Sequence, residues 1–335
     1  MIKKEKITFG IYGCGMIASL HAMAVREIPN AALIGAADIN YDRALSFAKK
    51  EKTEAFNSFD DMLSSKKIDT VCICTPSGTH KELAIRALDA GKNIVLEKPM
   101  AFTSSDCDEI IEACKRSQKK LMVISQLRTL TDVKRAKKII DSGALGKITV
   151  VNANMKYYRS PDYYKDSWRG TRALDGGGAL MNQGIHGVDL ICYLAGKIKN
   201  AKAFSKTLVH DIEVEDTLAA CLEFECGAVG IIEATTSVYP GFNRKIEICG
   251  SLGSIIMNEG EIEYLAMNGE IVEERTSKNK PSGSSNPSNI KHMGHKNQIQ
   301  DFVNLLSGCE NIDYCDEYQG KIAIEAIEKI YNNSN

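Results

Sequence analysis

The sequence has almost no net charge and no long apolar run. Its 335 residues include 42 basic and 43 acidic side chains, so the formal net charge is −1, whereas proteins that bind nucleic acids or anionic membrane surfaces carry a basic excess. No apolar run approaches the roughly 20 residues needed to cross a bilayer, and the apolar stretch near the N-terminus is too short for a signal peptide. We therefore expect a soluble cytoplasmic protein with no nucleic-acid or membrane partner.

Paired cysteine motifs are also missing. The 11 cysteines are an odd number and are scattered along the chain, so we expect reduced thiols that pack as small hydrophobic side chains. Cys72 and Cys74 form C-x-C rather than C-x-x-C, and two such side chains in a strand share one face. His292 and His295 lie in a polar segment without a cysteine or acidic cluster. We expect both histidines to be solvated, and no metal site is predicted.

The apolar fraction of 44% and charged fraction of 25% are ordinary for a globular protein, and the length favours two domains. In the first third of the chain, short apolar segments alternate with amphipathic ones. Strands are expected at residues 7–12, 32–37, 70–75, 93–97 and 121–124, and helices at 16–26, 41–50, 60–65, 80–90 and 104–117. This alternation is typical of a parallel sheet covered on both faces. It predicts an α/β fold with a doubly wound, Rossmann-type dinucleotide-binding domain at residues 1–125.

The rest of the chain, residues 126–335, has a different pattern. Helices are expected at 132–142, 179–195, 298–306 and 319–331, strands at 148–158 and repeatedly from 201 to 274, and a mobile polar loop at 277–296. Successive strands joined by glycine-bearing turns favour an α+β domain with a large, mostly antiparallel sheet. Because such a sheet leaves one face open, we expect a homo-oligomer that buries it.

A glycine loop follows the first strand. The segment Gly13-Cys14-Gly15-Met16-Ile17-Ala18 has the pattern G-x-G-x-x-A and opens the first helix. In such a loop the glycines allow a tight turn and a close approach of the backbone to a pyrophosphate, which the helix N-terminus attracts. Asp38 ends the next strand, where it can accept hydrogen bonds from ribose hydroxyls and repel a 2′-phosphate. We predict NAD rather than NADP, with Arg43 the nearest cation in the sequence.

Three further motifs follow the glycine loop in order. They are Thr75-Pro76-Ser77-Gly78-Thr79-His80, Glu97-Lys98-Pro99 and the block Gly176–Asp189. With the glycine loop they make the chain resemble the Gfo/Idh/MocA oxidoreductase family over nearly its whole length. The segments around Tyr163 and Trp168, Met181-Asn182-Gln183, and Asp211–Asp216 most resemble the branch that oxidises carbon 3 of hexopyranosides. That branch includes UDP-N-acetylglucosamine-uronate 3-dehydrogenases.

The resemblance implies two catalytic residues. Lys98 matches the family's catalytic lysine, whose positive charge would stabilise a developing alkoxide. His186 matches the second catalytic position and would act as general base in oxidation and as general acid in reduction. Asn182 stands four residues before His186, where inositol dehydrogenase-like members carry Asp. Without that charge, we expect the acid–base chemistry to shift toward Lys98, or to His186 without a charged partner.

The resemblance also implies binding residues. Those expected to bind the cofactor, besides Asp38, Lys98 and the glycine loop (Gly13, Cys14, Gly15, Met16, Ile17), are Thr75, Pro76, Ser77, His80, Glu97, Trp168 and Arg169. Those expected to bind the substrate, besides Lys98 and His186, are Arg128, Tyr158, Arg159, Tyr163, Asn182 and Gln183. Aromatic rings stack on sugar faces, and arginine binds carboxylate or phosphate through two hydrogen bonds. The alternative for this segment is a tyrosine-rich loop buried at an interface.

These observations predict an NAD-dependent dehydrogenase that takes a hydride from a secondary hydroxyl of a sugar, nucleotide sugar or glycoside, at carbon 3. Four alternatives remain open: an inositol dehydrogenase, a sugar ketoreductase, an NAD-dependent glycosidase that oxidises its substrate transiently, and a non-catalytic NAD sensor. Net release of NADH would distinguish a dehydrogenase from a glycosidase, because a glycosidase regenerates its cofactor in place.

Overall fold

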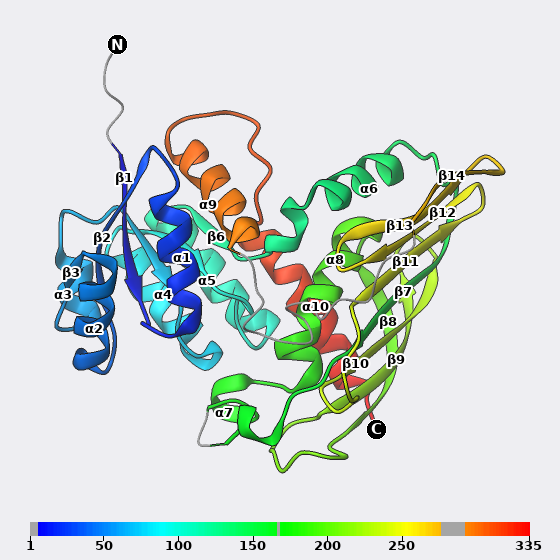
Figure 1. Cartoon of the computed structure of the whole chain (residues 1–335), viewed down its shortest axis with the longest axis horizontal. Helices are drawn as coiled ribbons and strands as arrows, with labels where there is room; N and C mark the ends of the chain where they lie inside the picture. The colour runs from blue at the N-terminus through cyan, green and yellow to red at the C-terminus, as the bar shows by residue number, and fades with distance from the viewer. Residues whose placement is uncertain (1–5, 166–167, 276–291) are drawn as a thin grey trace. The chain divides into compact units, whose positions relative to one another are not determined.

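The computed structural model describes residues 6–165, 168–275 and 292–335 (Figure 1). They form two compact units. Residues 6–126 and 292–321 make the first, and the described residues from 127 to 275 together with 322–335 make the second. The sequence-based division at residue 125 assigned the whole remainder to the second domain. The structure differs from that division in returning residues 292–321 to the first unit.

The first unit contains a six-stranded parallel sheet in the order β3-β2-β1-β4-β5-β6. Its strands are β1 (Ile7–Tyr12), β2 (Ala31–Ala37), β3 (Glu54–Ala55), β4 (Thr70–Ile73), β5 (Asn93–Leu96) and β6 (Leu121–Val123). β1 pairs with β2 on one side and with β4 on the other, so the strand order reverses between β1 and β4. This confirms the predicted doubly wound fold, whose ligands bind at the carboxyl ends of the strands near such a reversal. The two-residue strand β3 was not predicted.

The helices of the first unit lie close to their expected positions, with one exception. They are α1 (Met16–Arg26), α2 (Tyr41–Glu51), α3 (Phe59–Ser64), α4 (His80–Asp89), α5 (Ser104–Ser117) and α9 (Met293–Leu306), with the 3-10 turn η1 (Ser77–Thr79). A second 3-10 turn, η2 (Gln126–Thr129), begins at Gln126, and its residues from Leu127 on belong to the second unit. The side chains of Asn40, Ser58 and Thr103 cap α2, α3 and α5 by accepting a backbone N–H three residues on. The exception is α9. It begins at Met293, inside the segment expected to be a loop, whose residues 277–291 lie outside the described part of the chain.

Helix α9 completes the core of this unit. Its Ile299, Phe302 and Val303 are fully buried in one cluster with side chains of α1, α2 and the sheet, among them Phe9 and Val95. A parallel sheet has to be covered on both faces to bury its apolar strands, and the local β-α-β connections alone do not supply this helix. A segment from the C-terminal third of the chain is therefore part of the N-terminal fold (Figure 1).

The second unit is built on an eight-stranded sheet in the order β14-β13-β12-β11-β7-β10-β9-β8. Its strands are β7 (Ile148–Lys156), β8 (Ile198–Lys206), β9 (Thr217–Phe224), β10 (Val229–Thr235), β11 (Lys245–Gly250), β12 (Gly253–Asn258), β13 (Glu261–Met267) and β14 (Glu270–Glu274). Every pair of neighbours is antiparallel except β7 and β10. The expected mostly antiparallel sheet is confirmed.

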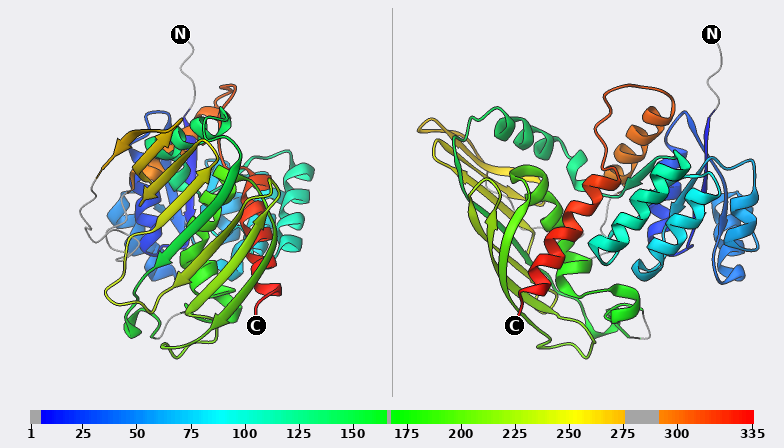
Figure 2. Two further views of the ribbon diagram at one scale, coloured as in Figure 1. Left: turned by 90° about the vertical axis from the view of Figure 1, so that its right-hand side faces the viewer. Right: turned by 180° about the vertical axis from the view of Figure 1, so that it is seen from behind.

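Helices lie on one face of this sheet (Figure 2). The helical elements of the second unit are α6 (Thr131–Asp141), η3 (Pro161–Tyr163), α7 (Arg172–Asp175), the π-helical segment η4 (Ala179–Gly184), α8 (Ile185–Ala195) and, from Ile322 on, α10 (Glu317–Asn332). On the sheet, Phe204, Val229 and Ile231 are large apolar side chains that are 67%, 57% and 40% exposed. Exposed apolar surface of this kind suits a subunit contact. Assembly through this sheet remains a prediction.

The expectation that the cysteines pack as small hydrophobic side chains holds for the seven that are buried, whereas Cys249 is half-buried and Cys221, Cys226 and Cys309 are exposed. All eleven lie in the described residues and all are free thiols. Cys72 and Cys74 are buried in the same core cluster, on one face of the first sheet. No helix in the described part of the chain is long and apolar enough to cross a membrane.

Removing the Phe302 side chain should test whether α9 belongs to the N-terminal core. We expect Phe302→Ala to lower the free energy of unfolding by about 3–5 kcal/mol, because it leaves a cavity among fully buried side chains. The measurement is urea unfolding followed by circular dichroism. Met293→Ala on the same helix is the control, since Met293 is 49% exposed and its loss should change stability by no more than about 0.5 kcal/mol. Equal effects of the two changes would contradict the packing of α9.

Candidate functional site

The glycine loop connects β1 to α1 and has the shape of an anion site. Gly13 has φ +91°, and a Cβ atom there would lie 2.7 Å from the carbonyl oxygen of Cys74, so only glycine fits. A Cβ atom on Gly15 would meet nothing within 4 Å. Helix α1 has no side-chain cap and no acidic residue in its first turn. The positive dipole end of α1 and the open space beside Gly15 together suit the binding of a pyrophosphate.

Asp38 is held beside this loop. It is buried at the end of β2, its Oδ2 accepts the backbone N–H of Cys14 (2.8 Å) and its Oδ1 accepts that of Asn40 (2.9 Å). The Arg43 guanidinium lies 3.7 Å from Oδ1 and is largely exposed. Cys14 supplies a backbone donor rather than a reactive thiol, since burial raises the pKa of that thiol to about 12.

The segment after β4 is tied to the segment after β5. His80 is buried, with Nε2 3.1 Å from the carbonyl oxygen of Thr75 and Nδ1 2.7 Å from that of Pro99. The Thr75 and Thr79 hydroxyls are hydrogen-bonded at 2.7 Å. Ser77, in the turn η1, is buried as well. One imidazole thus braces two loops that both lie at the carboxyl edge of the sheet.

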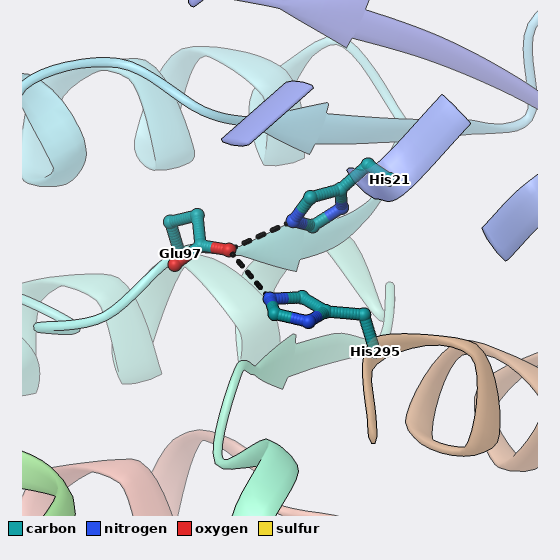
Figure 3. Close-up of side chains that lie close together, drawn as sticks. All are labelled: His21, Glu97 and His295. Atoms are coloured by element: carbon teal, nitrogen blue, oxygen red, sulfur yellow. Dashed lines mark hydrogen bonds and ion pairs between the residues drawn. The ribbon is translucent and has the colours of Figure 1, made fainter. Parts of the chain in front are cut away.

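Glu97-Lys98-Pro99 follows β5 at the same edge. The Oε2 atom of Glu97 accepts the backbone N–H of Lys98 at 3.2 Å, and Oε1 lies 2.8 Å from His21 Nε2 and 3.5 Å from His295 Nε2 (Figure 3). Glu97 is buried and Lys98 is partly exposed. The Lys98–Pro99 peptide bond is cis. The backbone around Lys98 is thus held by Glu97 on one side and by the contact of His80 with the Pro99 carbonyl oxygen on the other.

The expectation that both late histidines are solvated was wrong for His295. It lies on α9, is 1% exposed and faces Glu97. The sequence did not indicate this contact, because Glu97 and α9 are distant in the chain and meet only in the folded unit. His292 is partly exposed and pairs with Glu27 at 2.9 Å. Sequence reasoning also gave no role to His21, whose only signal was its position on the buried face of α1.

In the second unit, the glycine block opens the segment η4. A Cβ atom on Gly178 would lie 1.7 Å from the carbonyl oxygen of Glu215, so the two backbones can approach only at glycine. The buried Glu215 carboxylate accepts the backbone N–H groups of Gly178 and Leu180, each at 2.9 Å, and the Tyr331 hydroxyl at 2.8 Å. Burial raises the pKa of Glu215. These bonds fix the backbone that leads into α8, and sequence reasoning did not identify them.

Several predicted substrate residues meet at this segment. Arg159 Nη2 donates to Gln183 Oε1 at 2.7 Å, and Gln183 Nε2 donates to the Tyr163 hydroxyl at 3.0 Å and to Asn182 Oδ1 at 3.2 Å. The Asn182 amide donates to the buried Asp175, a partner the sequence did not indicate. The structure thus joins four of the predicted residues in one hydrogen-bonded cluster.

Of the other predicted residues, Arg169 contacts this cluster directly. The Arg169 guanidinium lies 4.7 Å from the centre of the Tyr163 ring and 5.1 Å from that of Trp168. His186 occupies the first turn of α8, four residues after Asn182, and is partly buried. Tyr158 is set slightly apart, its ring edge-on to Tyr239 at 5.2 Å between centres.

Arg128 stands in a different environment. Its Nε and Nη2 atoms donate to the two carboxylate oxygens of Asp189 at 3.0 and 2.6 Å, and both residues are buried. The guanidinium also lies over the Tyr193 ring, 4.8 Å from its centre. A buried arginine that makes two hydrogen bonds to one carboxylate fixes the geometry of the two segments that it joins, here η2 and α8. The structure therefore does not bring Arg128 into the cluster of Arg159 and Gln183.

Known families match both units in the same order. Residues 7–125 match the family described as "Oxidoreductase family, NAD-binding Rossmann fold", and residues 133–256 match the "GFO/IDH/MocA C-terminal domain". The chain belongs to the Gfo/Idh/MocA oxidoreductases. The N-terminal unit of this Gfo/Idh/MocA protein is therefore an NAD-binding domain, in agreement with the shape of its glycine loop.

Solved and curated relatives share this architecture. The WlbA dehydrogenase from Bordetella pertussis, solved in complex with NADH and UDP-GlcNAcA, is 30% identical, with a TM-score of 0.87 over 98% of this chain and 96% of its own. Levoglucosan dehydrogenase from Pseudarthrobacter phenanthrenivorans is 29% identical over 291 residues, covering 76% of this chain and 74% of its own. Myo-inositol 2-dehydrogenase from Thermotoga maritima is 28% identical over 254 residues, 73% of each chain. This Gfo/Idh/MocA protein is thus an NAD-dependent oxidoreductase among sugar and polyol dehydrogenases.

The buried His21 should make stability depend on pH. Burial lowers the pKa of His21 below its ordinary value of 6.5, so below that pH the unfolded chain binds a proton that the folded protein does not. The free energy of unfolding should therefore fall as the pH falls below 6.5, by up to about 1.4 kcal/mol per pH unit from this residue. Urea unfolding between pH 8 and 5.5 measures the slope.

His21→Gln should make that slope shallower, because glutamine does not titrate. Met23→Gln, at a more exposed position on the same helix, should keep the wild-type slope. An unchanged slope in His21→Gln would mean that His21 is protonated equally in both states.

Proposed function

We propose that this protein is an NAD-dependent dehydrogenase that oxidises a secondary hydroxyl of a pyranoside at carbon 3, with Lys98 and His186 handling the hydroxyl proton. The observation that carries the proposal is that both ionisable residues are present, each on a backbone segment that a buried carboxylate anchors: Glu97 beside Lys98, and Glu215 at the segment leading to His186. The 30% identity with a dehydrogenase that binds UDP-GlcNAcA supports the choice of substrate class.

Lys98 has the properties needed for the alcohol group. When bound, NAD accepts the hydride. The Lys98 ammonium would stabilise the negative charge that develops on the substrate oxygen as its proton leaves. Glu97 and His80 hold the peptide groups on either side of Lys98, so its backbone does not have to reorganise during the reaction.

His186 would take the proton in oxidation and return it in reduction. Its helical neighbour Asn182 carries no charge, but the Asn182 amide is oriented by Asp175 on one side and Gln183 on the other. An oriented amide can fix a sugar hydroxyl without binding a proton itself. We infer that Asn182 orients the substrate, while His186 acts without a directly adjacent carboxylate of the inositol dehydrogenase type.

The polar cluster of the second unit suits an anionic sugar. Arg159 and Arg169 carry positive charge around the Tyr163 ring, whose face can stack on a pyranose. A uronate or phosphate group would pair with such a guanidinium. This supports a nucleotide sugar or sugar acid over an uncharged inositol, which remains the second candidate because of the 28% identity to a myo-inositol 2-dehydrogenase.

The substrate class can be measured directly. We expect the purified protein with NAD to produce NADH, and a sugar product two mass units lighter, from a pyranoside in a panel of nucleotide sugars, sugar acids, glycosides, free hexoses and inositols. Lys98→Ala should lower kcat/KM for that substrate by about 10³-fold or more, because it removes the charge that stabilises the alkoxide. Absorbance of NADH and mass spectrometry of the sugar are followed together.

Lys92→Ala is a matched control, since Lys92 is a buried lysine at the opposite end of β5 that donates to the carbonyl oxygens of Ser65 and Ile68. It should leave kcat/KM near the wild-type value once the protein is folded. Sugar cleavage without net NADH would instead establish a glycosidase, and turnover of inositols alone would establish the second candidate.

Asp38 should determine the preference of the enzyme for NAD over NADP. We expect Asp38→Asn to lower kcat/KM with NAD by roughly 10–100-fold, the effect of losing a charge-assisted hydrogen bond worth about 1.5–3 kcal/mol. Activity with NADP should rise relative to NAD, because the repulsion of the 2′-phosphate disappears while Arg43 remains nearby. Steady-state kinetics with both cofactors measure the ratio, and Asp42→Asn, exposed at the start of α2, should leave it unchanged.

A further inference from the structure

Three side chains from separate segments meet in the core of the first unit. They are His21 of α1, Glu97 after β5 and His295 of α9, and we call them the His–Glu–His cluster (Figure 3). None is more than 6% exposed. Both imidazoles point their Nε2 atoms toward the same oxygen, Oε1 of Glu97, at 2.8 Å from His21 and 3.5 Å from His295, and the two rings stand edge to face with centres 5.4 Å apart.

The spacing favours a hydrogen-bonded carboxylate over a bound metal ion. Two ligands of a tetrahedral zinc ion, each about 2.0–2.1 Å from the metal, are separated by roughly 3.3 Å. His21 Nε2 and Glu97 Oε1 are closer than that, at an ordinary hydrogen-bond distance of 2.8 Å. Within the described residues the cluster also offers three ligand groups, whereas a structural zinc site has four.

The cluster holds a negative charge in the core. Burial raises the pKa of Glu97, but the hydrogen bonds from His21 and His295 outweigh burial and hold that pKa well below its usual range. Burial lowers the pKa of His21, so its ring is neutral at neutral pH. Its single proton belongs on Nε2, which faces the carboxylate, because His21 Nδ1 has no hydrogen-bond partner in the described part of the chain.

We propose that His21 and His295 are positioning residues, which orient the Glu97 carboxylate so that it fixes the peptide bearing Lys98. The geometry assigns the two carboxylate oxygens different tasks. Oε1 faces the two imidazoles, and Oε2 accepts the Lys98 backbone N–H at 3.2 Å. The role of Lys98 as the catalytic lysine rests on the proposed function.

The cluster also connects Lys98 to the two helices that fix its surroundings. His21 lies on α1, the helix that begins at the glycine loop. His295 lies one turn before Gln298, whose amide accepts the Ser125 N–H at 2.9 Å and donates to the Val123 carbonyl oxygen at 2.7 Å. Because Gln298 anchors α9 to the end of β6, His295 arrives at Glu97 from a fixed position. Through Glu97, the cluster thus connects the Lys98 backbone to α1, which begins at the glycine loop, and to α9, which is anchored at the end of β6.

Four variants test this role. Glu97→Gln leaves one of the two donors, His21 Nε2 or the Lys98 N–H, without an acceptor, because an amide has only one oxygen. His21→Met removes the donor, and His21→Gln restores an N–H in nearly the same place. Glu51→Gln is the matched control: Glu51 is a buried carboxylate of the same unit that pairs with Arg26 on α1.

We expect Glu97→Gln and His21→Met to lower kcat by about 10–100-fold, the effect of misplacing a catalytic group by about 1 Å. The Kd of NAD, measured by fluorescence titration, should change by less than about threefold, since the glycine loop is untouched. His21→Gln should recover most of the lost kcat, and Glu51→Gln should keep the wild-type kcat. The proposal would be overturned if Glu97→Gln and Glu51→Gln lowered kcat equally. It would also be overturned if the loss of kcat in Glu97→Gln followed a matching loss of NAD affinity or of stability.

Two measurements do not depend on turnover. Hydrogen exchange of the Lys98 amide should be faster in Glu97→Gln and His21→Met than in the wild type, and two-bond ¹H–¹⁵N spectra of histidine-labelled protein should show His21 protonated on Nε2. These results would support the cluster even if no sugar is oxidised, in which case the proposed function alone fails. Unchanged Lys98 exchange, or a stoichiometric metal ion that is lost in His21→Gln, would overturn the positioning role.

Discussion

The fold of the first unit depends on the need to bury a parallel sheet on both of its faces. Strands as apolar as β4 and β5 leave no solvated side, so each face needs helices. The β-α-β connections provide most of them, and α9 provides the last, with Ile299, Phe302 and Val303 in the core that α1 and α2 share. This requirement brings a distant segment of the chain to the carboxyl end of β5. The environment of Lys98 is therefore a consequence of how the sheet is covered.

Buried carboxylates fix the functional loops of both units. Asp38 accepts the Cys14 N–H in the glycine loop, Glu97 accepts that of Lys98, and Glu215 accepts two N–H groups at the start of η4. A loop at a site cannot use the hydrogen bonds of a helix or strand, yet its buried N–H groups still need acceptors. A carboxylate can satisfy two or more such donors at once. The segments that carry the proposed cofactor and substrate residues are thus held by buried acidic side chains.

The second unit carries its polar cluster on a scaffold that matches the family's C-terminal domain. The chain is similar to a myo-inositol 2-dehydrogenase, a levoglucosan dehydrogenase and a dehydrogenase solved with UDP-GlcNAcA. The cluster of Arg159, Tyr163 and Gln183 lies on irregular structure at one end of that scaffold. Because side chains on loops can change without disturbing a sheet, a single fold can select different sugars. Under the proposed function, that cluster rather than the fold would select the substrate.

Local patterns in the sequence determined the architecture. Alternating apolar segments predicted the parallel sheet, and the bounds of β1, α1 and α5 agree with the structure because their turns, caps and periodicity are encoded by neighbouring residues. The glycine loop and Asp38 could be located for the same reason. Only the tertiary structure decided that Arg128 pairs with Asp189, that Asp175 orients Asn182, and that His295 is buried against Glu97. In each of these contacts the energy depends on a partner supplied by a separate turn, helix or strand, so the properties of the residue alone do not predict it.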